Sequence, residues 1–523
     1  MTSLQQRLEA ISGEQLRGQK RGLEKESLRA QPDGKLALTP HPAALGSALT
    51  HPHITTDYSE SQLELITGVH ASVDACLAEL TEVHQYTAQV LHKPGQSSGD
   101  EMMWASSMPC GLPTDETIPL GRYGSSNVGR AKSVYRMGLG HRYGRRMQTI
   151  SGIHYNWSMP GIDNDGYFAL IRNFRRHAFL LLALFGASPT VCSTFLAGRE
   201  HDLQSLGNGG TFYKPYGTTL RMGRLGYQSD AQATLGVSYN GLEGYAASLH
   251  DALTRPWPPY EALGIRNPGG DYNQLATTLL QIENEFYGTI RPKRVIFPGE
   301  RPLHALRERG VEYVEVRLLD LNPFETIGIA PSTLRFLDVF LMHCLLSESP
   351  PDTPDEIHEI TQNQQLTASQ GREPGLLLTR HGERITLVQW GAEILAGLLP
   401  IAQALDAAHG GDAHAQAVAQ ASASLAAPDT LPSAQVLAAV QRDHGDSFVS
   451  FVRAQSLATH NRLLAMPWSA EQQTRYAAMA AKSLEDQRAI EAGDSMPFEM
   501  YRKEYTSPAR LGRAAYEPVH RGV

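Results

Sequence analysis

The chain of 523 residues is 41% hydrophobic and 19% charged, which is typical of a soluble globular protein and excludes a collagen-like or largely disordered chain. Its 46 Lys and Arg residues stand against 54 Asp and Glu residues, giving a formal net charge of −8. This charge disfavours nonspecific binding to nucleic acid or to anionic membranes. The expected partners are therefore small molecules, with no nucleic acid and no membrane.

The N-terminal segment and the cysteines indicate a cytoplasmic protein. Residues 1–30 lack the apolar core of a secretory signal. The four cysteines are too few and too scattered for a disulfide framework, and none belongs to a CxxC pair. We expect Cys110 and Cys192 to be small packed side chains.

Two segments near the N-terminus place carboxylates together. In residues 21–26 (RGLEKE), Glu24 and Glu26 share one face if the segment is a strand, because side chains alternate along a strand. The second segment is residues 55–64 (TTDYSESQLE), in which Thr56 is placed to cap a helix. The acidic residues of that helix would fall on one stripe, at positions i, i+3 and i+7: Asp57, Glu60 and Glu64.

Three later segments alternate apolar and polar residues, which predicts strands with one polar face. They cover residues 150–159, 281–287 and 313–319. Such strands predict a sheet that lines a cavity, with helices such as residues 166–185 packed outside. The polar faces would carry His154 and Asn156, then Glu283, Glu285 and Tyr287, and finally Glu315 and Arg317.

The composition of the remaining segments indicates how the chain is divided into regions. Residues 178–198 carry no charge, but Gly186 and Pro189 favour a buried helix, a turn and a second short element over a membrane span. Ala-rich stretches with helical spacing predict a helical C-terminal region. We expect a catalytic unit over residues 1–380, the helical region over residues 381–503 and a mobile tail over residues 504–523.

The carboxylates suggest a cation. Clustered carboxylates on a sheet face raise one another's pKa unless a cation lies between them. Oxygen ligands with one imidazole suit Mg²⁺ or Mn²⁺ that bridges nucleotide phosphates. Each pattern by itself also fits a solvated strand or helix face, so periodicity leaves both interpretations open.

Longer motifs add a family resemblance. Between about residues 21 and 350, seven segments resemble the bacterial single-chain glutamate-cysteine ligases in order and spacing, and such motifs are far more specific than a short glycine pattern. The segments are RGLEKESLR (21–29), ALGSALTHPHITTDYSESQLELIT (44–67), SMPCGLP (107–113), YGSSNVGRAKSVYRMGLGHRYGRRMQTISGIHYNWSMP (123–160), LFGASP (184–189), LQIENEFYGTIRPKR (280–294) and GVEYVEVRLLDLNPF (310–324).

The resemblance implies an α+β, glutamine-synthetase-like fold, in which a curved, mostly antiparallel sheet forms an active-site funnel surrounded by helices. It implies ATP-dependent ligation of the γ-carboxyl of L-glutamate to L-cysteine through a γ-glutamyl phosphate, the first step of glutathione synthesis. The implied ligands are glutamate, cysteine, ATP and Mg²⁺ or Mn²⁺. Feedback inhibition by glutathione and a monomeric state are further expectations.

The resemblance also implies roles for matched residues. Arg317 would contact the transferring phosphoryl group. The metal ligands would be Glu24, Glu26, Asp57, Glu64, His154 and Glu315. The substrate-binding residues would be Tyr58, Tyr135, Arg136, Gln148, Ile150, Asn156, Arg221, Tyr227 and Tyr287, with Tyr58, Ile150, Arg221, Tyr227 and Tyr287 forming the cysteine pocket. Tyr58 stands where the family pattern has phenylalanine, which puts fine substrate selectivity in question.

Two other interpretations stay open. A related carboxylate-amine ligase would use the same metals and would differ only in the acceptor pocket. A non-catalytic sensor of glutamate or nucleotide would be expected to lose metal ligands, and all six expected ligands are present.

Overall fold

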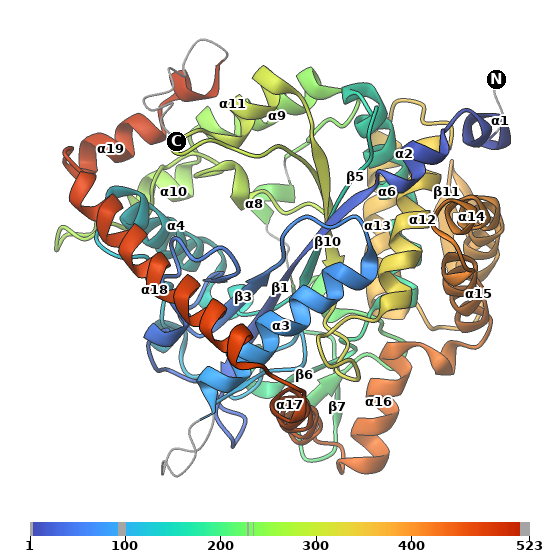
Figure 1. The fold of residues 1–523 in the computed structure, drawn as a ribbon, viewed down its shortest axis with the longest axis horizontal. Coiled ribbons are helices and arrows are strands. Elements are labelled where there is room, and N and C mark those ends of the chain that lie inside the picture. The colour runs from blue at the N-terminus through green and yellow to red at the C-terminus, as the bar shows by residue number, and fades with distance from the viewer. Residues whose placement is uncertain (1–3, 93–100, 227–229, 234, 513–523) are drawn as a thin grey trace.

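An antiparallel sheet lies at the centre of the molecule (Figure 1). The computed structural model describes residues 4–92, 101–226, 230–233 and 235–512. Six strands follow the order β2-β3-β1-β5-β10-β9, and β4 pairs with the end of β1. These strands are β1 (Lys20–Ala30), β2 (Ile54–Thr56), β3 (Gln62–Ile66), β4 (Met102–Met103), β5 (Ile153–Ser158), β9 (Ile290–Lys293) and β10 (Tyr313–Leu319).

One face of the sheet is apolar and covered by helices. Ile153, Tyr155 and Trp157 of β5 are fully buried, as are Val314 and Val316 of β10. The helices involved are α3 (Val73–Leu91), α6 (Asn164–Phe185) and α12 (Pro331–Leu346). Helix α3 packs on β1 and β3, α6 packs on β9 and β10, and α12 packs on α3 and α6. The alternation predicted for residues 150–159 and 313–319 is thus confirmed.

Helix α6 accounts for the uncharged stretch after residue 178. The Asp163 side chain caps the helix by accepting a hydrogen bond from the Gly166 N–H at 2.8 Å. Leu180, Leu181 and Leu182 are buried in the core. The chain then turns into β6 (Thr190–Cys192) and α7 (Ser193–Leu196), so the expected buried helix, turn and second element are confirmed.

Shorter elements surround this core. The remaining helices before residue 380 are α1 (Leu4–Glu9), α2 (Gly13–Arg17), α4 (Asn127–Tyr143), α5 (Arg145–Gln148), α8 (Asp230–Ala233), α9 (Leu242–Thr254), α10 (Pro258–Leu263), α11 (Pro302–Arg309) and α13 (Pro354–Gln370). The 3-10 helices are η1 (Ala43–Leu45), η2 (Asp115–Thr117), η3 (Leu220–Met222), η4 (Glu283–Glu285), η5 (Pro428–Thr430) and η6 (Pro508–Leu511). Two small sheets contain β6 with β7 (Gln204–Leu206) and β8 (Thr211–Tyr213), and β11 (Leu377–Arg380) with β12 (Glu383–Thr386).

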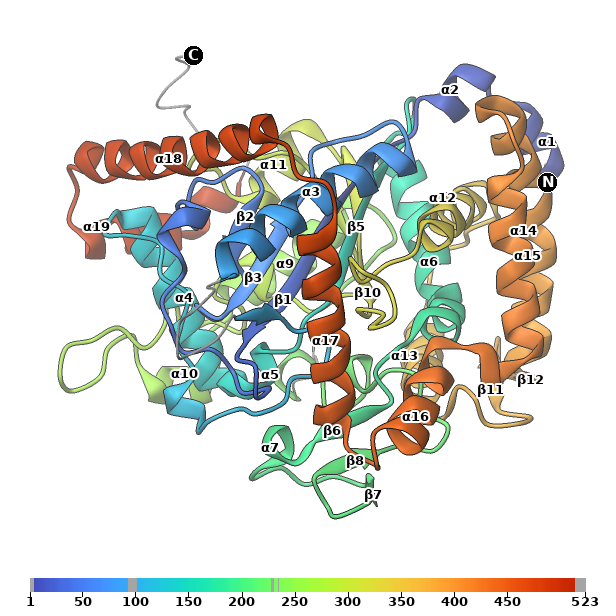
Figure 2. The same cartoon turned by 60° about the horizontal axis from the view of Figure 1, so that its bottom comes forward.

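The C-terminal region is helical, as predicted, and it passes round the central sheet. Figures 1 and 2 show α14 and α15 on one side, α16 and α17 next to the small β6-β8-β7 sheet, and α18 on the other side along α3 and α4. The Ser47 N–H donates to Oγ of Ser483 at 2.9 Å, which fixes α18 to the segment after η1. The helices are α14 (Leu387–His409), α15 (Ala413–Ala426), α16 (Pro432–Asp443), α17 (Phe448–Ala465), α18 (Ala470–Gly493) and α19 (Phe498–Tyr505).

Two features of this region bear on earlier expectations. Arg307 donates to the carbonyl of Leu511 at 2.6 Å, so the described part of residues 504–523 contacts α11, and the mobility of this tail stays a prediction. Residues 513–523 lie outside the described residues.

Among the described helices, α14 is the one long and apolar enough to cross a membrane by length and composition, and 44% of its apolar window is buried inside the protein.

The helix expected to begin after Thr56 is instead a β-hairpin. Strands β2 and β3 pair antiparallel, with Thr56 opposite Leu63 and Thr55 opposite Glu64. The helical prediction was wrong because the acidic spacing fits a helix, whereas Leu63 and Leu65, both fully buried, alternate as in a strand. Glu64 therefore reaches the sheet face from a strand.

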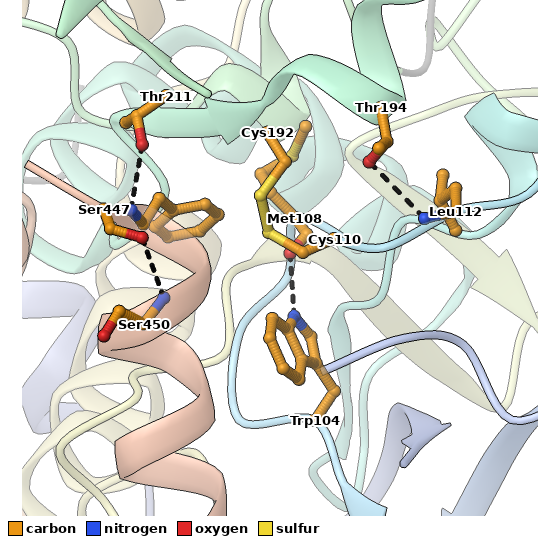
Figure 3. The surroundings of a disulfide bond; sticks show 10 residues. Trp104, Met108, Cys110, Leu112, Cys192, Thr194, Thr211, Ser447 and Ser450 are labelled. Carbon is orange, nitrogen blue, oxygen red and sulfur yellow. Dashed lines mark hydrogen bonds between the residues drawn. A yellow bond between two sulfur atoms is a disulfide. The ribbon is translucent and has the colours of Figure 1, made fainter. Parts of the chain in front are cut away.

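Cys110 and Cys192 form a disulfide, so the expectation of two separate packed side chains was wrong. Their Cα atoms are 5.4 Å apart across a sequence separation of 82 residues. Figure 3 shows Trp104 next to this bond, with its indole N–H donating to the Met108 carbonyl at 3.0 Å. The bond links the segment after β4 to the end of β6, and the spacing of four cysteines could not reveal that these segments meet.

Candidate active site

Acidic side chains from neighbouring strands meet on the second, polar face of the sheet. The antiparallel register explains the meeting, because directly paired residues project from the same face. Glu26 pairs with Glu64, and these two residues come from β1 and β3. The neighbouring strands continue the row, with Glu24 opposite His154 on β5 and Asn156 opposite Glu315 on β10.

Glu24 is held by both polar residues of β5. Its Oε2 lies 3.1 Å from Nδ1 of His154, and its Oε1 accepts a hydrogen bond from the Asn156 amide at 3.0 Å. Burial raises the pKa of Glu24, but the hydrogen bond with His154 and the charges of His154 and Lys293 together outweigh this and lower it. Burial, with help from the Arg317 charge, lowers the pKa of His154 and keeps its imidazole available as a neutral ligand.

The pKa values of Glu26 and Glu64 are shifted in the opposite direction and are raised. Burial and then the nearby Asp57 raise the pKa of Glu26 to about 8. Burial raises the pKa of Glu64 well above its usual range, and Glu24, Asp57 and Glu26 raise it further. Glu26 is also fixed by the Gly152 N–H, which donates to Oε2 at 2.7 Å. These carboxylates are crowded in the way expected of a site that gathers positive charge.

Glu315 lies between two cations at the other end of the row. Nη1 of Arg317 donates to its Oε2 at 2.8 Å, and Nζ of Lys293 lies 3.2 Å from its Oε1. Burial raises the pKa of Glu315, but Lys293 and Arg317 together hold it well below its usual range. Glu315 therefore stays ionised although its side chain is only 1% exposed.

Donor atoms of Glu24, His154 and Glu315 lie within 4.8 Å of one another. Two carboxylates and an imidazole at this separation form a donor set suited to a hard or borderline divalent cation. Glu26 joins them at the edge, with its Oε1 3.7 Å from Nε2 of His154. The structure thus brings together five of the six expected metal ligands along the polar face, with Glu64 across the strand pair from Glu26.

Asp57, the sixth expected ligand, follows β2 and adds negative charge near Glu26 and Glu64. Arg136 of α4 donates to the Asp57 carbonyl and stacks over the Tyr123 ring at 4.5 Å. Glu60, which the helical prediction placed on the same stripe, instead accepts hydrogen bonds from the backbone N–H groups of His41 and Arg122. Glu60 therefore fixes loops rather than joining the row.

The segment at residues 281–287 is not the predicted strand. It contains the 3-10 helix η4, and its acids have separate partners, because Glu283 accepts from Arg301 at 2.6 Å and Glu285 accepts from Arg142 at 2.8 Å. Tyr287 follows this 3-10 helix, and its place in the cysteine pocket stays a prediction. Its hydroxyl accepts a hydrogen bond from the Gln148 amide at 2.7 Å.

Arg221 lies beside β10 rather than in open solvent. Its Nη2 donates to the Arg317 carbonyl at 2.8 Å, and the residue is 1% exposed. Glycine at position 152 leaves room for the Arg221 guanidinium, because a Cβ at this residue would lie only 2.0 Å from the Arg221 Nη2. Tyr227, its expected partner, lies outside the described residues.

Three other expected substrate residues pack against neighbouring elements. Tyr58 is 1% exposed, and a Cβ at Gly140 of α4 would lie 2.7 Å from its hydroxyl. Ile150 is fully buried in an apolar cluster, while its carbonyl accepts from the Gln62 amide at 3.1 Å. Tyr135 packs against the apolar cluster that joins α4 to α19.

Sequence reasoning missed Lys293 and Arg291 of β9. Arg291 pairs with Glu315 in the strand register, and Lys293 contacts the Glu315 carboxylate. Their alternation in TIRPKR was the available signal, since two cations at i and i+2 on a strand share one face.

Comparison with known proteins settles the family. A family model described as glutamate-cysteine ligase matches residues 4–367, which is well over half of the chain. The chain belongs to the glutamate-cysteine ligase family. A glutamate-cysteine ligase of Alcanivorax borkumensis is 45% identical over 531 aligned residues, covering 97% of this chain and 99% of that protein. One of Azotobacter vinelandii is 46% identical, covering 92% of this chain and 93% of that protein.

Solved structures of similar proteins share this fold. The glutamate-cysteine ligase of Francisella tularensis, determined in complex with AMP, superposes with a TM-score of 0.88 at 34% identity, covering 94% of this chain and 98% of that one. A bifunctional glutathione synthetase of Pasteurella multocida shares the fold, with a TM-score of 0.69 at 23% identity over 90% of this chain and 57% of that one. The expected α+β fold of the glutamate-cysteine ligase family, with its antiparallel sheet and helical C-terminal region, is confirmed.

Proposed function

We propose that this chain, as a member of the glutamate-cysteine ligase family, catalyses the ATP-dependent ligation of the L-glutamate γ-carboxyl to L-cysteine through a γ-glutamyl phosphate. The observation that carries the proposal is the row of carboxylates on the polar sheet face with Arg317 beside it, 2.8 Å from Glu315. An acyl phosphate is needed because a free carboxylate is a poor acyl donor. The Francisella relative, solved with AMP, supports an adenine nucleotide as the co-substrate.

The residues present fit Mg²⁺ or Mn²⁺. The donors are carboxylate oxygens with one imidazole. Burial and then the neighbouring carboxylates raise the pKa values of Glu26 and Glu64, and a cation would balance the negative charge of these carboxylates. The proposed ligands are Glu24, Glu26, Asp57, Glu64, His154 and Glu315. When bound, the cation would neutralise nucleotide and phosphoryl charge during transfer.

Arg317 is proposed to act on the transferring phosphoryl group. Its guanidinium presents a planar fork of N–H donors, which matches two phosphoryl oxygens at once. Because Glu315 holds one of these donors at 2.8 Å, the fork is already oriented in the free protein. Lys293 stands on the other side of Glu315 and would keep that carboxylate ionised.

The amino-acid pocket is proposed around Arg221, Gln148 and Tyr287. Gln148 fixes the Tyr287 hydroxyl, and the Tyr143 ring packs edge-on against Tyr287 with centroids 5.5 Å apart. These contacts orient polar groups that could bind the amine acceptor. Tyr58, Tyr135, Arg136, Ile150, Asn156 and Tyr227 complete the proposed substrate-binding set.

The decisive experiment measures phosphate release from ATP with glutamate and one candidate amine at a time, with and without a chelator. Cysteine should give the highest kcat/KM, and excess chelator should abolish turnover. A higher kcat/KM for another amine would make the chain a related carboxylate-amine ligase with the same metal site. Absence of turnover with every amine would overturn the catalytic proposal.

A further inference from the structure

A second group of metal-binding side chains lies behind the sheet, away from the row of carboxylates. One ring nitrogen of His177, one of His343 and the thiol sulfur of Cys344 lie within 4.8 Å of one another. His177 belongs to α6, and the other two residues are consecutive near the end of α12. The two helices pack directly on each other, so the group bridges them.

Both imidazoles have an unused nitrogen in the protein interior. Within the described part of the chain, Nδ1 of His177 and Nδ1 of His343 are buried and have no hydrogen-bond partner. Nε2 of His343 lies 3.4 Å from the Ser347 hydroxyl. A buried nitrogen without a partner destabilises the folded protein, and a bound ligand would satisfy it.

The surrounding chain leaves room for these rings. Gly397 of α14 faces His343, and a Cβ at that position would lie 2.9 Å from the His343 Nε2. The His177 and His343 ring centroids are 5.7 Å apart, and His177 meets the Trp390 ring edge-on at 6.4 Å. His177 is half-buried, whereas His343 and Cys344 are buried.

The chemical state of the group suits a metal. Burial lowers the pKa of His177 to about 3 and that of His343 to about 4, so both rings are neutral ligands near pH 7. Cys344 is a buried free thiol outside the disulfide. The nearest guanidinium charges are already balanced, since Arg176 pairs with Glu356 at 2.7 Å and Arg380 pairs with Glu393.

We propose that His177, His343 and Cys344 bind one Zn²⁺ ion, with water as the fourth ligand. Zinc sites use imidazole and thiolate ligands at about 2.0 and 2.3 Å, which gives separations of roughly 3.3 to 3.5 Å between donors in a tetrahedral site. Since the three donors lie within 4.8 Å of one another, side-chain rotations on the two helices can bring them to these separations. On binding, the Cys344 thiol releases its proton to solvent and the sulfur bonds to the ion.

The ion would clamp the scaffold behind the catalytic sheet. Asp338, earlier on α12, accepts a hydrogen bond from Arg21 of β1 at 3.3 Å and another from the Tyr155 hydroxyl of β5. A metal bridge from α12 to α6 therefore stabilises the layer against which these strands pack. Its expected effect is on stability rather than on the chemical step.

Cobalt substitution tests this proposal on the intact protein. Co²⁺ bound to a thiolate gives a strong near-ultraviolet charge-transfer band, whereas Co²⁺ on the carboxylates of the active site gives none. We expect the parent to develop this band with one Co²⁺ per chain and to lose it when Zn²⁺ is added. Zn²⁺ should also raise the thermal unfolding midpoint in a concentration-dependent way.

Matched variants locate the thiolate. Cys344→Ser and His343→Gln should lose the band and the Zn²⁺-dependent rise in midpoint, while Cys76→Ser, which removes the other free thiol, should keep both. The absence of a thiolate band in the parent would overturn the proposal without any variant. A band that persists in Cys344→Ser would overturn it as well.

Discussion

Nη1 of Arg317 donates a hydrogen bond at 2.8 Å to Oε2 of Glu315, two positions earlier on the same strand and on the same face of the sheet. The proposed phosphoryl-binding group is thus held by a proposed metal ligand. The active-site guanidinium is oriented before any substrate arrives, which limits the reorganisation needed during phosphoryl transfer.

Arg317→Lys should lower kcat by roughly ten- to a hundredfold and should change the KM for ATP little, because lysine keeps the charge but loses the planar fork. Steady-state kinetics with glutamate and cysteine at saturation would measure this. The exposed Arg442→Lys serves as the matched control and should behave as the parent does. A raised KM with unchanged kcat would identify Arg317 as a residue that binds the ground state.

Glu26→Gln should raise the Mg²⁺ concentration for half-maximal activity by at least about tenfold, since a neutral amide is a weaker ligand for a hard cation. Activity measured across a Mg²⁺ titration would give this shift. Glu485→Gln changes a fully solvated carboxylate on α18 and should leave the titration unchanged. Superimposable curves for Glu26→Gln and the parent would remove Glu26 from the ligand set.

Tyr287→Phe removes the hydroxyl that accepts from Gln148 and should lower kcat/KM for cysteine by roughly ten- to a hundredfold. ATP-dependent phosphorylation of a sulfoximine analogue of the tetrahedral adduct needs no incoming amine, so it should persist. The two assays together separate the half-reactions. Tyr216→Phe, at a residue that is 45% exposed, is the control, and equal loss in both assays would argue against an acceptor role.

Lys25→Met should stabilise the fold, and more so at low pH. Lys25 lies on the apolar face of β1, where burial lowers its pKa from 10.5 to about 7. Between these values the unfolded chain binds the extra proton, so the cost of the buried charge is full below pH 7 and falls as the pH rises towards 10.5. The gain in unfolding free energy should be about 2 to 3 kcal/mol larger near pH 6 than near pH 9.

Denaturant unfolding of the parent and of Lys25→Met at both pH values would measure this difference. Lys482→Met alters a lysine whose side chain is 66% exposed and should show little pH-dependent gain. A gain for Lys25→Met that is equal at both pH values would mean that Lys25 is not neutral in the folded protein.

Replacing both Cys110 and Cys192 by serine should lower stability by about 2 to 4 kcal/mol under oxidising conditions, because the unfolded chain loses a crosslink. Unfolding with and without dithiothreitol would measure it. Reduced parent and variant should differ much less. If the oxidised parent and the variant unfold alike, the bond does not contribute to stability.

Sequence patterns were most informative where the signal is local. Alternation identified β5 and β10, because each strand has one face against helices and one that carries the polar residues of the carboxylate row. The same reasoning failed for β3 because three acids at helical spacing fitted a helix equally well. It failed at η4 because the partners of its acids, Arg142 and Arg301, come from elsewhere in the chain.

The arrangement of the candidate site needed long-range information. Glu24 meets His154 only because β1 and β5 pair in one register, and those residues are 130 positions apart. No local pattern specifies such a register. The family motifs supplied the set of residues, whereas the cations of β9 and the disulfide came from the structure, since their meaning depends on which segments lie side by side.

Because the C-terminal helices pack on N-terminal segments, these contacts can form only late in synthesis of the chain. Glu24 and Glu26 leave the ribosome first, whereas α18, which holds Ser47 through Ser483, follows more than four hundred residues later. At about 5 to 20 residues per second, the N-terminal strands wait roughly half a minute to a minute and a half for that helix. A nascent chain therefore carries the segment after η1 long before α18 can pack on it, and a ribosome that stops before α18 releases a protein in which Ser47 lacks its partner Ser483.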